Sequence, residues 1–246
     1  MHCNKNAIEL RGLSYAYPDG TAALDNLSVT IRHTERVALL GPNGAGKSTL
    51  IGHLNGITQA QTGTVLIDDE PITPATLKSV RERVGIVFQD PDDMLFMTTI
   101  YDDVAFGPRN MGLTADTVDS RVQQTLAAVG LDALLQKPGM HLSFGQKKRA
   151  ALASVLSMQP AILVLDEPTS NLDPRARRAM IDFLKQLDVT LLLATHDLDL
   201  AWELTSRALV LDAGHLVADG PTHDLMRDAD LMRTHGLDTP PLATRP

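Results

Sequence analysis

One stretch of the chain, GPNGAGKS, has the residue types and spacing that bind phosphate groups. It matches the pattern G-x4-G-K-[ST] and lies between the runs VALL and STLIGHLN, where a strand and a helix are expected. The glycines would let backbone amides close on phosphates, and the helix N-terminus would add a positive end. We expect Lys47 to reach the β- and γ-phosphates of a nucleotide and Ser48 to bind Mg²⁺. The predicted nucleotide-binding residues here are Gly41, Pro42, Asn43, Gly44, Ala45, Gly46, Lys47, Ser48 and Thr49.

A second stretch, AILVLDEP, ends an apolar run with two adjacent carboxylates, Asp166 and Glu167. Ligands of an open α/β sheet bind beyond the carboxyl ends of its strands, so both acids are expected to face the phosphate site. Asp166 would suit Mg²⁺, and Glu167 would suit a base that activates water. The alternative is that this pair caps a helix predicted to begin at Pro174, although a cap needs one acid and not two.

Two further residues are candidates for the same site. His196 ends the apolar run TLLLAT, and its position at the carboxyl end of a strand predicts contact with a γ-phosphate. The other histidines are expected to be ordinary surface or core residues. Tyr17 precedes Pro18, Asp19 and Gly20, and two interpretations stay open for it: plain packing in a strand, or a stacking face for an adenine ring.

Composition and charge narrow the class of protein. The chain of 246 residues can bury a full core, either as one large α/β domain or as a core with an inserted subdomain. Its formal net charge of −8, from 30 acidic and 22 basic residues, argues against a general nucleic-acid binder. The single Cys3 excludes a disulfide framework and fits a reducing compartment. Because we find no apolar signal-peptide core and no apolar run near about 20 residues, any membrane role is expected to come through a partner.

The order of the predicted elements indicates three regions. Strands with alternating apolar residues, AIELRGLSYAY and LDNLSVTIR, come first and are joined by the turn PDGTA. From about residue 90 to residue 158 the pattern is helical. Short all-apolar strands then alternate with helices, which is typical of a parallel sheet buried on both faces. The run ALVLDAGHLVADG is expected to form a hairpin, and the chain is expected to finish in a loose tail.

A third stretch, LSFGQKKR, is not explained by these elements alone. Ser143 and Gln146 have the spacing of a capping box, in which the serine hydroxyl accepts the amide of Gln146 and Gln146 reaches back. That interpretation leaves Gly145 and the basic run KKR unexplained. It also leaves open why a chain with a complete phosphate loop needs a second polar helix opening further along.

Taken in this order, LSFGQ, LVLDEP and ATHD make the chain similar to the ATP-binding subunits of ABC transporters over about residues 7 to 225. The resemblance implies an α/β fold: a P-loop NTPase (RecA-like) core with an antiparallel β subdomain and an inserted α-helical signature subdomain. It implies an ATPase domain over residues 1–232, with the core at about 1–89 and 159–232 and the helical subdomain at about 90–158. Residues 233–246 would form the C-terminal tail.

The resemblance also implies a role for each motif. Tyr17 corresponds to the adenine-stacking aromatic residue, Asp173 to the aspartate of the D-loop, and His196 to the switch histidine. The expected catalytic residues are Glu167, His196 and Gln89, of which Gln89 belongs to the Q-loop. The expected Mg²⁺ ligands are Ser48, Gln89 and Asp166, and Asp166 forms the Walker B pair with Glu167. ATP and Mg²⁺ are the implied cofactors.

In this family two subunits pack head to tail, and the signature of one subunit caps the γ-phosphate held by the phosphate loop of the other. The stretch LSFGQ corresponds to this signature, usually written LSGGQ. The resemblance therefore implies that Ser143, Phe144, Gly145 and Gln146 act in trans, where Gly145 allows close backbone approach. The implied partner is a second ATPase subunit, either the same chain or a close paralogue.

The runs VGIVFQDPDDMLF and LSFGQKKRAALASVLSM resemble a narrower branch, the energy-coupling-factor and cobalt/nickel-uptake ATPases. Phe144 is typical of that branch, whereas Met94 stands where relatives often carry Gln and Thr34 where they usually carry Gly. The branch implies that Asp92 and Asp93 border a groove for basic coupling helices of a transmembrane subunit. A solvated acidic loop is the alternative.

These inferences predict an ATP-hydrolysing subunit that powers a membrane importer, for cobalt or nickel ions or for a vitamin. The expected partners are a second ATPase subunit and integral-membrane transport subunits, with no nucleic acid, at the cytoplasmic face of the cell membrane. The alternative is a soluble ABC-type ATPase that acts on ribosomes or DNA. Such proteins usually carry two cassettes in one chain or coiled-coil insertions, and often basic segments, which this sequence does not show. A kinase or GTPase would leave LSFGQ unexplained, and the chain has no NKxD motif.

Overall fold

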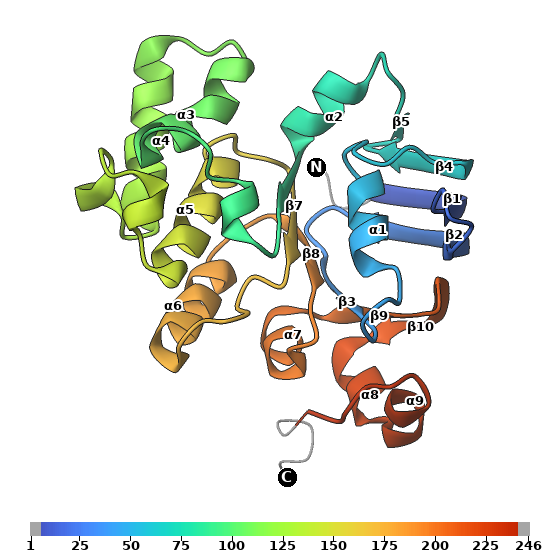
Figure 1. Cartoon of the computed structure of the whole chain (residues 1–246). Helices are drawn as coiled ribbons and strands as arrows, with labels where there is room; N and C mark the ends of the chain where they lie inside the picture. The colour runs from blue at the N-terminus through green and yellow to red at the C-terminus, as the bar shows by residue number, and fades with distance from the viewer. Residues whose placement is uncertain (1–5, 241–246) are drawn as a thin grey trace.

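The structure, a computed structural model, describes residues 6–240 and contains two β-sheets with a block of helices beside them (Figure 1). The single Cys3 and the end of the expected tail, 241–246, lie outside the described residues. A central sheet separates the second sheet from the helical block (Figure 1). Within residues 6–240, no helix is long and apolar enough to span a bilayer.

The central sheet carries the apolar strands that the sequence predicted. Its strands, in order across the sheet, are β10 (His215–Pro221), β9 (Arg207–Asp212), β3 (Arg36–Leu40), β8 (Thr190–Ala194), β7 (Ile162–Asp166) and β6 (Val84–Val87). All neighbours are parallel except β9 and β10, which form the expected hairpin. Every residue of β7 and β8 is buried, as in strands covered on both faces.

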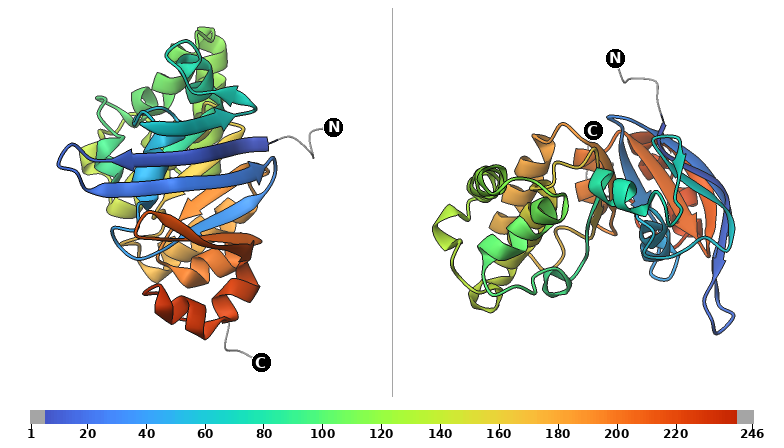
Figure 2. Two further views of the ribbon diagram at one scale, coloured as in Figure 1. Left: turned by 90° about the vertical axis from the view of Figure 1, so that its right-hand side faces the viewer. Right: turned by 90° about the horizontal axis from the view of Figure 1, so that it is seen from above.

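The second sheet is antiparallel and lies across one face of the molecule (Figure 2). Its strands, in order, are β2 (Ala22–Arg32), β1 (Asn6–Ala16), β4 (Thr62–Ile67) and β5 (Glu70–Pro71). The hairpin of β1 and β2 around the predicted turn is confirmed. Apolar side chains of this sheet share one buried core with helix α1 (Lys47–His53) and the central sheet, for example Leu10 with Leu50 and Leu39. The second sheet therefore fixes α1 against the central sheet.

The helical block follows β6 in the chain and precedes β7. It contains α3 (Ile100–Asn110), α4 (Ala115–Ala128) and α5 (Phe144–Leu156), which pack on one another through a core that includes Val104, Val122 and Ala150. Helix α5 also packs against the central sheet, because Leu152 shares a buried cluster with Leu163. The other helices are α2 (Leu77–Arg83), α6 (Pro174–Lys185), α7 (Leu198–Leu204), α8 (Thr222–Arg227) and α9 (Ala229–Thr234). Short 3-10 helices cover Pro91–Asp93, Asp132–Leu134 and Gly139–His141.

The start of the expected tail at residue 233 is wrong, because it falls inside helix α9. Leu237, beyond that helix, is buried in a cluster that includes Met232 and Leu198. His235 Nδ1 also lies 2.9 Å from Asp212 Oδ2 at the end of β9. The chain therefore stays packed on the central sheet at least as far as Leu237.

The two residues that depart from the narrower branch have structural tasks. Thr34 lies in the turn between β2 and β3 with a φ of 65°, in the left-handed region where a β-branched residue is strained and glycine is not. Its amide donates to Thr190 Oγ1 at 2.9 Å, at the amino end of β8. Met94 turns inward, where its sulfur accepts a hydrogen bond from Phe88 N at 3.3 Å. Neither residue lines a site at the carboxyl ends of the strands.

Candidate active site

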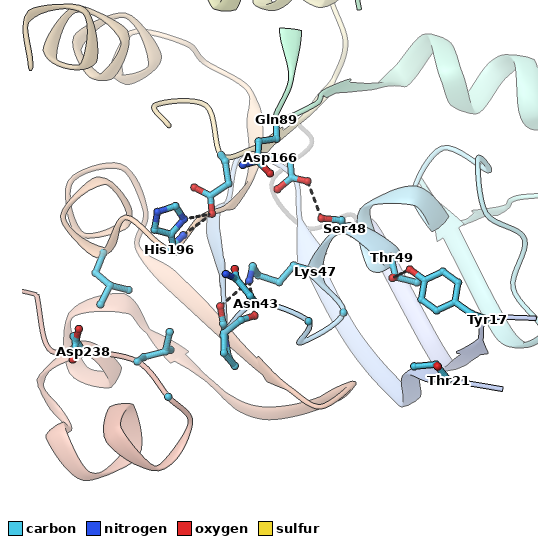
Figure 3. A pocket seen from close by; sticks show the side chains of 18 residues that line it. Tyr17, Thr21, Asn43, Lys47, Ser48, Thr49, Gln89, Asp166, His196 and Asp238 are labelled. Carbon is cyan, nitrogen blue, oxygen red and sulfur yellow. Dashed lines mark hydrogen bonds and ion pairs between the residues drawn. The ribbon is translucent and has the colours of Figure 1, made fainter. Parts of the chain in front are cut away.

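The carboxyl ends of β3, β7 and β8 open onto one cavity of about 770 Å³ (Figure 3). The register places Leu39 of β3 and Asp166 of β7 opposite the same residue of β8, Ala194, so the segments that follow these strands meet. Except for buried Ala45, all the predicted nucleotide-binding residues line this cavity, as do the predicted catalytic residues. The lining residues are Tyr17, Thr21, Gly41, Pro42, Asn43, Gly44, Gly46, Lys47, Ser48, Thr49, Gln89, Asp166, Glu167, His196, Leu198, Gly236, Leu237 and Asp238.

Close packing behind the phosphate loop explains two of its glycines. A Cβ on Gly41 would lie 2.1 Å from Leu211 O, and a Cβ on Gly46 would lie 2.4 Å from Ala23 O. Both glycines also have positive φ, 150° and 105°, which L side chains rarely adopt. The loop is therefore held between β9 and β2, and its shape depends on these two residues having no side chain.

The ammonium group of Lys47 lies inside this loop. Its Nζ donates to Gly41 O at 2.7 Å and to Pro42 O at 2.9 Å, and the residue is only 9% exposed. Burial lowers the pKa of Lys47, whereas the nearby carboxylates of Glu167 and Asp166 raise it. The amine is thus held at the centre of the loop, a position from which it can bind a phosphate group.

Oxygen atoms suited to a divalent cation meet beside the phosphate loop. Ser48 Oγ donates to Asp166 Oδ2 at 3.0 Å, and Gln89, just after β6, lines the same cavity. Burial raises the pKa of Asp166, whereas the hydrogen bond from Ser48 lowers it. Mg²⁺ prefers oxygen ligands and is usually held by one or two carboxylates together with substrate phosphates. The hydroxyl, amide and carboxylate groups present here fit the predicted Mg²⁺ site.

Glu167 and His196 contact each other just beyond the ends of β7 and β8. Glu167 Oε1 accepts hydrogen bonds from N and Nδ1 of His196, and its Oε2 accepts one from Thr195 Oγ1 at 3.0 Å. Glu167 has a left-handed φ of 48°, a conformation that a residue other than glycine keeps only when its surroundings support it. A buried, oriented carboxylate beside a phosphate loop can act as a general base.

The alternative that the acid pair caps a helix is wrong. Helix α6 is capped by Asp173, whose Oδ1 accepts a hydrogen bond from Ala176 N at 2.9 Å. Asp166 and Glu167 instead line the cavity. The predicted D-loop role of Asp173 concerns a second subunit and stays a prediction.

Tyr17 forms part of the cavity wall and is not packed in the strand core. Its ring is 44% exposed, lies edge-on to Tyr15 at 5.4 Å, and its hydroxyl makes a 2.6 Å hydrogen bond with Thr49 Oγ1. Plain strand packing does not account for an exposed ring at this place. The geometry favours the other interpretation, in which the ring can stack on a nucleotide base.

The LSFGQ residues lie away from this cavity. The capping box is confirmed, since Ser143 Oγ accepts from Gln146 N at 3.3 Å and Gln146 Oε1 accepts from Ser143 N at 2.9 Å. A Cβ on Gly145 would make only ordinary contacts, 3.5 Å from Leu172 and 3.6 Å from Ala176. Packing within the chain therefore explains Ser143 and Gln146 and does not explain the glycine.

A second cavity, of about 560 Å³, lies beside the acidic loop that follows β6. Asp92 lines it, but Asp92 Oδ1 lies 2.6 Å from Lys147 Nζ, so its charge is paired within the chain. Phe96 and Met140, 62% and 79% exposed, line the same cavity. Asp93 is exposed and does not line this cavity, so of the two acids only Asp92 borders the groove, and the docking of coupling helices there stays a prediction.

Several residues of the site were missed in the sequence. Thr195 supports Glu167, and it could have been found from its place in ATHD next to His196. Leu237 and Asp238 line the cavity, but the residues around them were assigned to the tail and carry no recognisable motif.

The phosphate loop lies between a strand of the largely parallel central sheet and a helix, acids follow a neighbouring strand, and a block of helices is inserted in the chain. Together these features define a P-loop NTPase with a helical subdomain. A family model described as ABC transporter matches residues 24–170. The chain belongs to the ABC transporter family, and within it to the ATP-hydrolysing subunits.

Individual relatives agree with this assignment along almost the whole chain. An ABC transporter ATP-binding protein of Streptomyces coelicolor is 52% identical over 95% of this chain and 90% of its own length. The energy-coupling factor transporter ATP-binding protein EcfA of Methanothermobacter thermautotrophicus is 46% identical over 95% of this chain and 76% of its own length. The solved structure of cbiO1 from Clostridium perfringens, described as part of the ABC transporter complex cbiONQ, matches with a TM-score of 0.82 at 38% identity and covers 98% of both chains.

Proposed function

We propose that this chain hydrolyses ATP to drive a membrane importer of the energy-coupling-factor or cobalt/nickel-uptake type. One observation carries the ATPase part: the phosphate loop, the Ser48–Asp166 pair and the Glu167–His196 pair share a single cavity. The importer type is supported by the similarity to EcfA and to cbiO1 along nearly all of the chain. Cobalt or nickel ions, or a vitamin, are the proposed solutes.

Binding of ATP would use residues on opposite sides of the cavity. The phosphate loop and Lys47 hold the β- and γ-phosphates, and the ring of Tyr17 stacks on the adenine. Ser48, Gln89 and Asp166 would hold Mg²⁺, which when bound neutralises negative charge on the phosphates. Thr49, which follows the phosphate loop in the sequence, connects the loop to Tyr17, because the hydroxyl groups of Thr49 and Tyr17 form a hydrogen bond.

The chemical step would depend on Glu167. Its carboxylate accepts a proton from the water whose oxygen attacks the γ-phosphorus, and the bond from that phosphorus to the β–γ bridging oxygen breaks, giving ADP and phosphate. His196 and Thr195 donate hydrogen bonds to the carboxylate and hold it in one orientation. Gln89, on the loop after β6, lies in the same cavity and would help to orient the water.

The active unit would be a head-to-tail dimer. Because Ser143, Phe144, Gly145 and Gln146 do not line the chain's own cavity, a role for them at a nucleotide requires a second subunit. Gly145 supports this: no contact among residues 6–240 demands a glycine there, whereas close approach of a phosphate to the backbone would. The D-loop residue Asp173 would lie at the same interface.

Attachment to the membrane would come through partners. The groove with exposed Phe96 and Met140 offers an apolar surface on which a helix of an integral-membrane subunit can pack. Docking there would hold the chain at the cytoplasmic face of the cell membrane.

The test is co-expression of the chain with candidate integral-membrane transport subunits, followed by purification in detergent and reconstitution into vesicles. We expect a stable complex that takes up its solute only when ATP is supplied, with Co²⁺, Ni²⁺ and vitamins tried in turn. A complex containing Glu167→Gln should assemble but not transport. Association with ribosomes or DNA in place of membrane proteins would overturn the importer and favour the soluble ATPase.

A further inference from the structure

Lys148 is a buried lysine with no task in the mechanism described so far. It lies on α5 and is only 2% exposed, although the two neighbouring basic residues of the KKR run lie nearer the surface. Its Nζ donates to Glu167 O at 2.6 Å and to Ser170 Oγ at 2.9 Å. Among the described residues, no carboxylate oxygen lies within 4.0 Å of it. Burying an ammonium group is costly, so its presence at this position calls for an explanation.

The contact with Glu167 involves the backbone of the proposed base. The carboxylate of Glu167 is held by His196 and Thr195, whereas its backbone carbonyl accepts a hydrogen bond from Lys148. Ser170 Oγ donates to the same carbonyl at 2.9 Å, so the amine and the hydroxyl together fix one oxygen atom. Since Glu167 has a left-handed φ of 48°, its conformation depends on such support.

The same lysine belongs to the helix that opens with the signature. Ser143 caps α5 and Phe144 begins it, and Lys148 Nζ lies 5.7 Å from the centre of the Phe144 ring. A helix moves as a rigid element over a few turns, so a shift of Ser143 carries Lys148 with it. The displaced ammonium would in turn move the carbonyl of Glu167.

We infer that Lys148 is a positioning residue that links the two nucleotide sites of the dimer. It aligns Glu167, the general base of its own site, in response to the nucleotide that the signature of the same chain contacts in the other site. The inference rests on the proposed function, because it needs the signature to act in trans. The burial of Lys148 lowers its pKa to about 8, in line with an amine held mainly by neutral oxygen atoms.

The test compares two variants of the full chain in ATP hydrolysis. Lys148→Met keeps most of the side-chain volume and removes the ammonium group. Ser170→Ala removes one of the two oxygen atoms that accept hydrogen bonds from Lys148. We expect kcat to fall about 10- to 100-fold in Lys148→Met, the scale of a misplaced catalytic group, while ATP affinity changes little. We also expect cooperativity between the sites, which can reach a Hill coefficient of about 2 for two sites, to fall towards 1. Ser170→Ala should show the same changes to a smaller extent.

A control on the same helix separates positioning from folding. Arg149 Nη1 donates to Val129 O at 2.7 Å inside the helical block, so Arg149→Met should lower the free energy of unfolding without changing the Hill coefficient. If Lys148→Met folds and keeps the wild-type Hill coefficient, the inference is overturned, even if kcat falls. If Lys148→Met does not fold, the Hill coefficient of Ser170→Ala decides: an unchanged, wild-type value overturns the inference. A wild-type protein that shows no cooperativity between its sites also overturns it. Glu167→Gln tests the proposed function separately, because its loss of hydrolysis does not depend on Lys148.

Discussion

Glu167 and His196 are joined by two hydrogen bonds to one oxygen atom. Glu167 Oε1 lies 2.8 Å from His196 N and 2.7 Å from His196 Nδ1. Both donors belong to His196, two residues beyond the end of β8, so the proposed base, which directly follows β7, is oriented by the segment that leaves the neighbouring strand. A carboxylate fixed in this way is suited to take a proton from one direction, from the cavity.

Replacement of Glu167 by Gln should therefore stop hydrolysis without preventing binding. An amide of the same shape cannot accept the proton, and we expect the rate to fall about 10²- to 10⁴-fold, the usual scale for loss of a positioned base. ATP affinity should be retained, since the phosphate loop is unchanged, and the ATP-bound dimer should accumulate. Steady-state hydrolysis and size-exclusion chromatography with ATP are the measurements.

The control is Glu82→Gln, which removes an acid on α2 that does not line the cavity. It should hydrolyse ATP like the wild type. A Glu167→Gln protein that does the same would show that Glu167 has only a structural role.

Removal of the Tyr17 ring tests the proposed stacking of this ring on the adenine of ATP. Tyr17→Ala should weaken ATP binding by about 1–2 kcal/mol, the order of an aromatic contact plus lost burial. GTP should be affected similarly, whereas pyrophosphate should bind as before. The matched variant Tyr17→Phe keeps the ring and removes only the 2.6 Å hydrogen bond to Thr49, and should bind ATP nearly normally. Equal losses for ATP and pyrophosphate in Tyr17→Ala would mean that the ring supports the fold only.

Much of this site could be predicted because its residues are close together in the sequence. The phosphate loop needs consecutive residues between one strand and one helix, and its two tightly packed glycines, Gly41 and Gly46, are part of the pattern itself. The acids Asp166 and Glu167 follow a strand that is apolar throughout because both of its faces are buried. Local pattern and tertiary position coincide at such places.

The basic run KKR shows where this reasoning stops. Lys147 pairs with Asp92, Lys148 with the carbonyl of Glu167, and Arg149 with the carbonyl of Val129. Three consecutive residues of a helix point in different directions, and each partner comes from a different segment of the chain. These contacts depend on how remote segments pack, which side-chain type alone does not reveal. The packed residue Leu237 was missed for the same reason.

Glu203 should make stability depend on pH in the acid range. Its hydrogen bonds to Arg178 and Lys185 lower the pKa of its carboxylate from 4.5 to about 2. A lowered folded-state pKa stabilises the protein above the unfolded value, and this stabilisation is lost as pH falls from about 4.5 towards 2. Glu203→Gln should cost about 1 kcal/mol at pH 7, a value reduced because both partners are nearly half exposed and screened by water.

Urea unfolding at constant ionic strength checks this expectation. The difference in the free energy of unfolding between wild type and Glu203→Gln should shrink when the pH is lowered from 7 to about 3.5. Glu82→Gln, in a partly buried position without an ion pair among the described residues, should show no such trend. A difference that stays constant over this range would contradict the assignment of the ion pairs to the folded state.

The trans role of the signature can be tested with a mixed dimer. Ser143 caps α5, and aspartate is an equally good cap, so Ser143→Asp should keep the helix while its charge repels a γ-phosphate of the partner site. Lys47→Ala should prevent phosphate binding in its own loop. Each variant alone forms dimers with two defective sites. In a mixed dimer, one site receives both lesions and the other receives neither, because an intact phosphate loop meets an intact signature.

If Ser143 acts in trans, mixing the two variants should therefore restore trapping of one ATP per mixed dimer. Nucleotide trapped with vanadate is a better measure than turnover, because one intact site per dimer does not guarantee continuous hydrolysis. Subunit exchange is verified with differently tagged chains, and unfolding curves show that Ser143→Asp remains folded. If mixed dimers form and trap no ATP, Ser143 acts within its own chain, and the capping box is then its whole function.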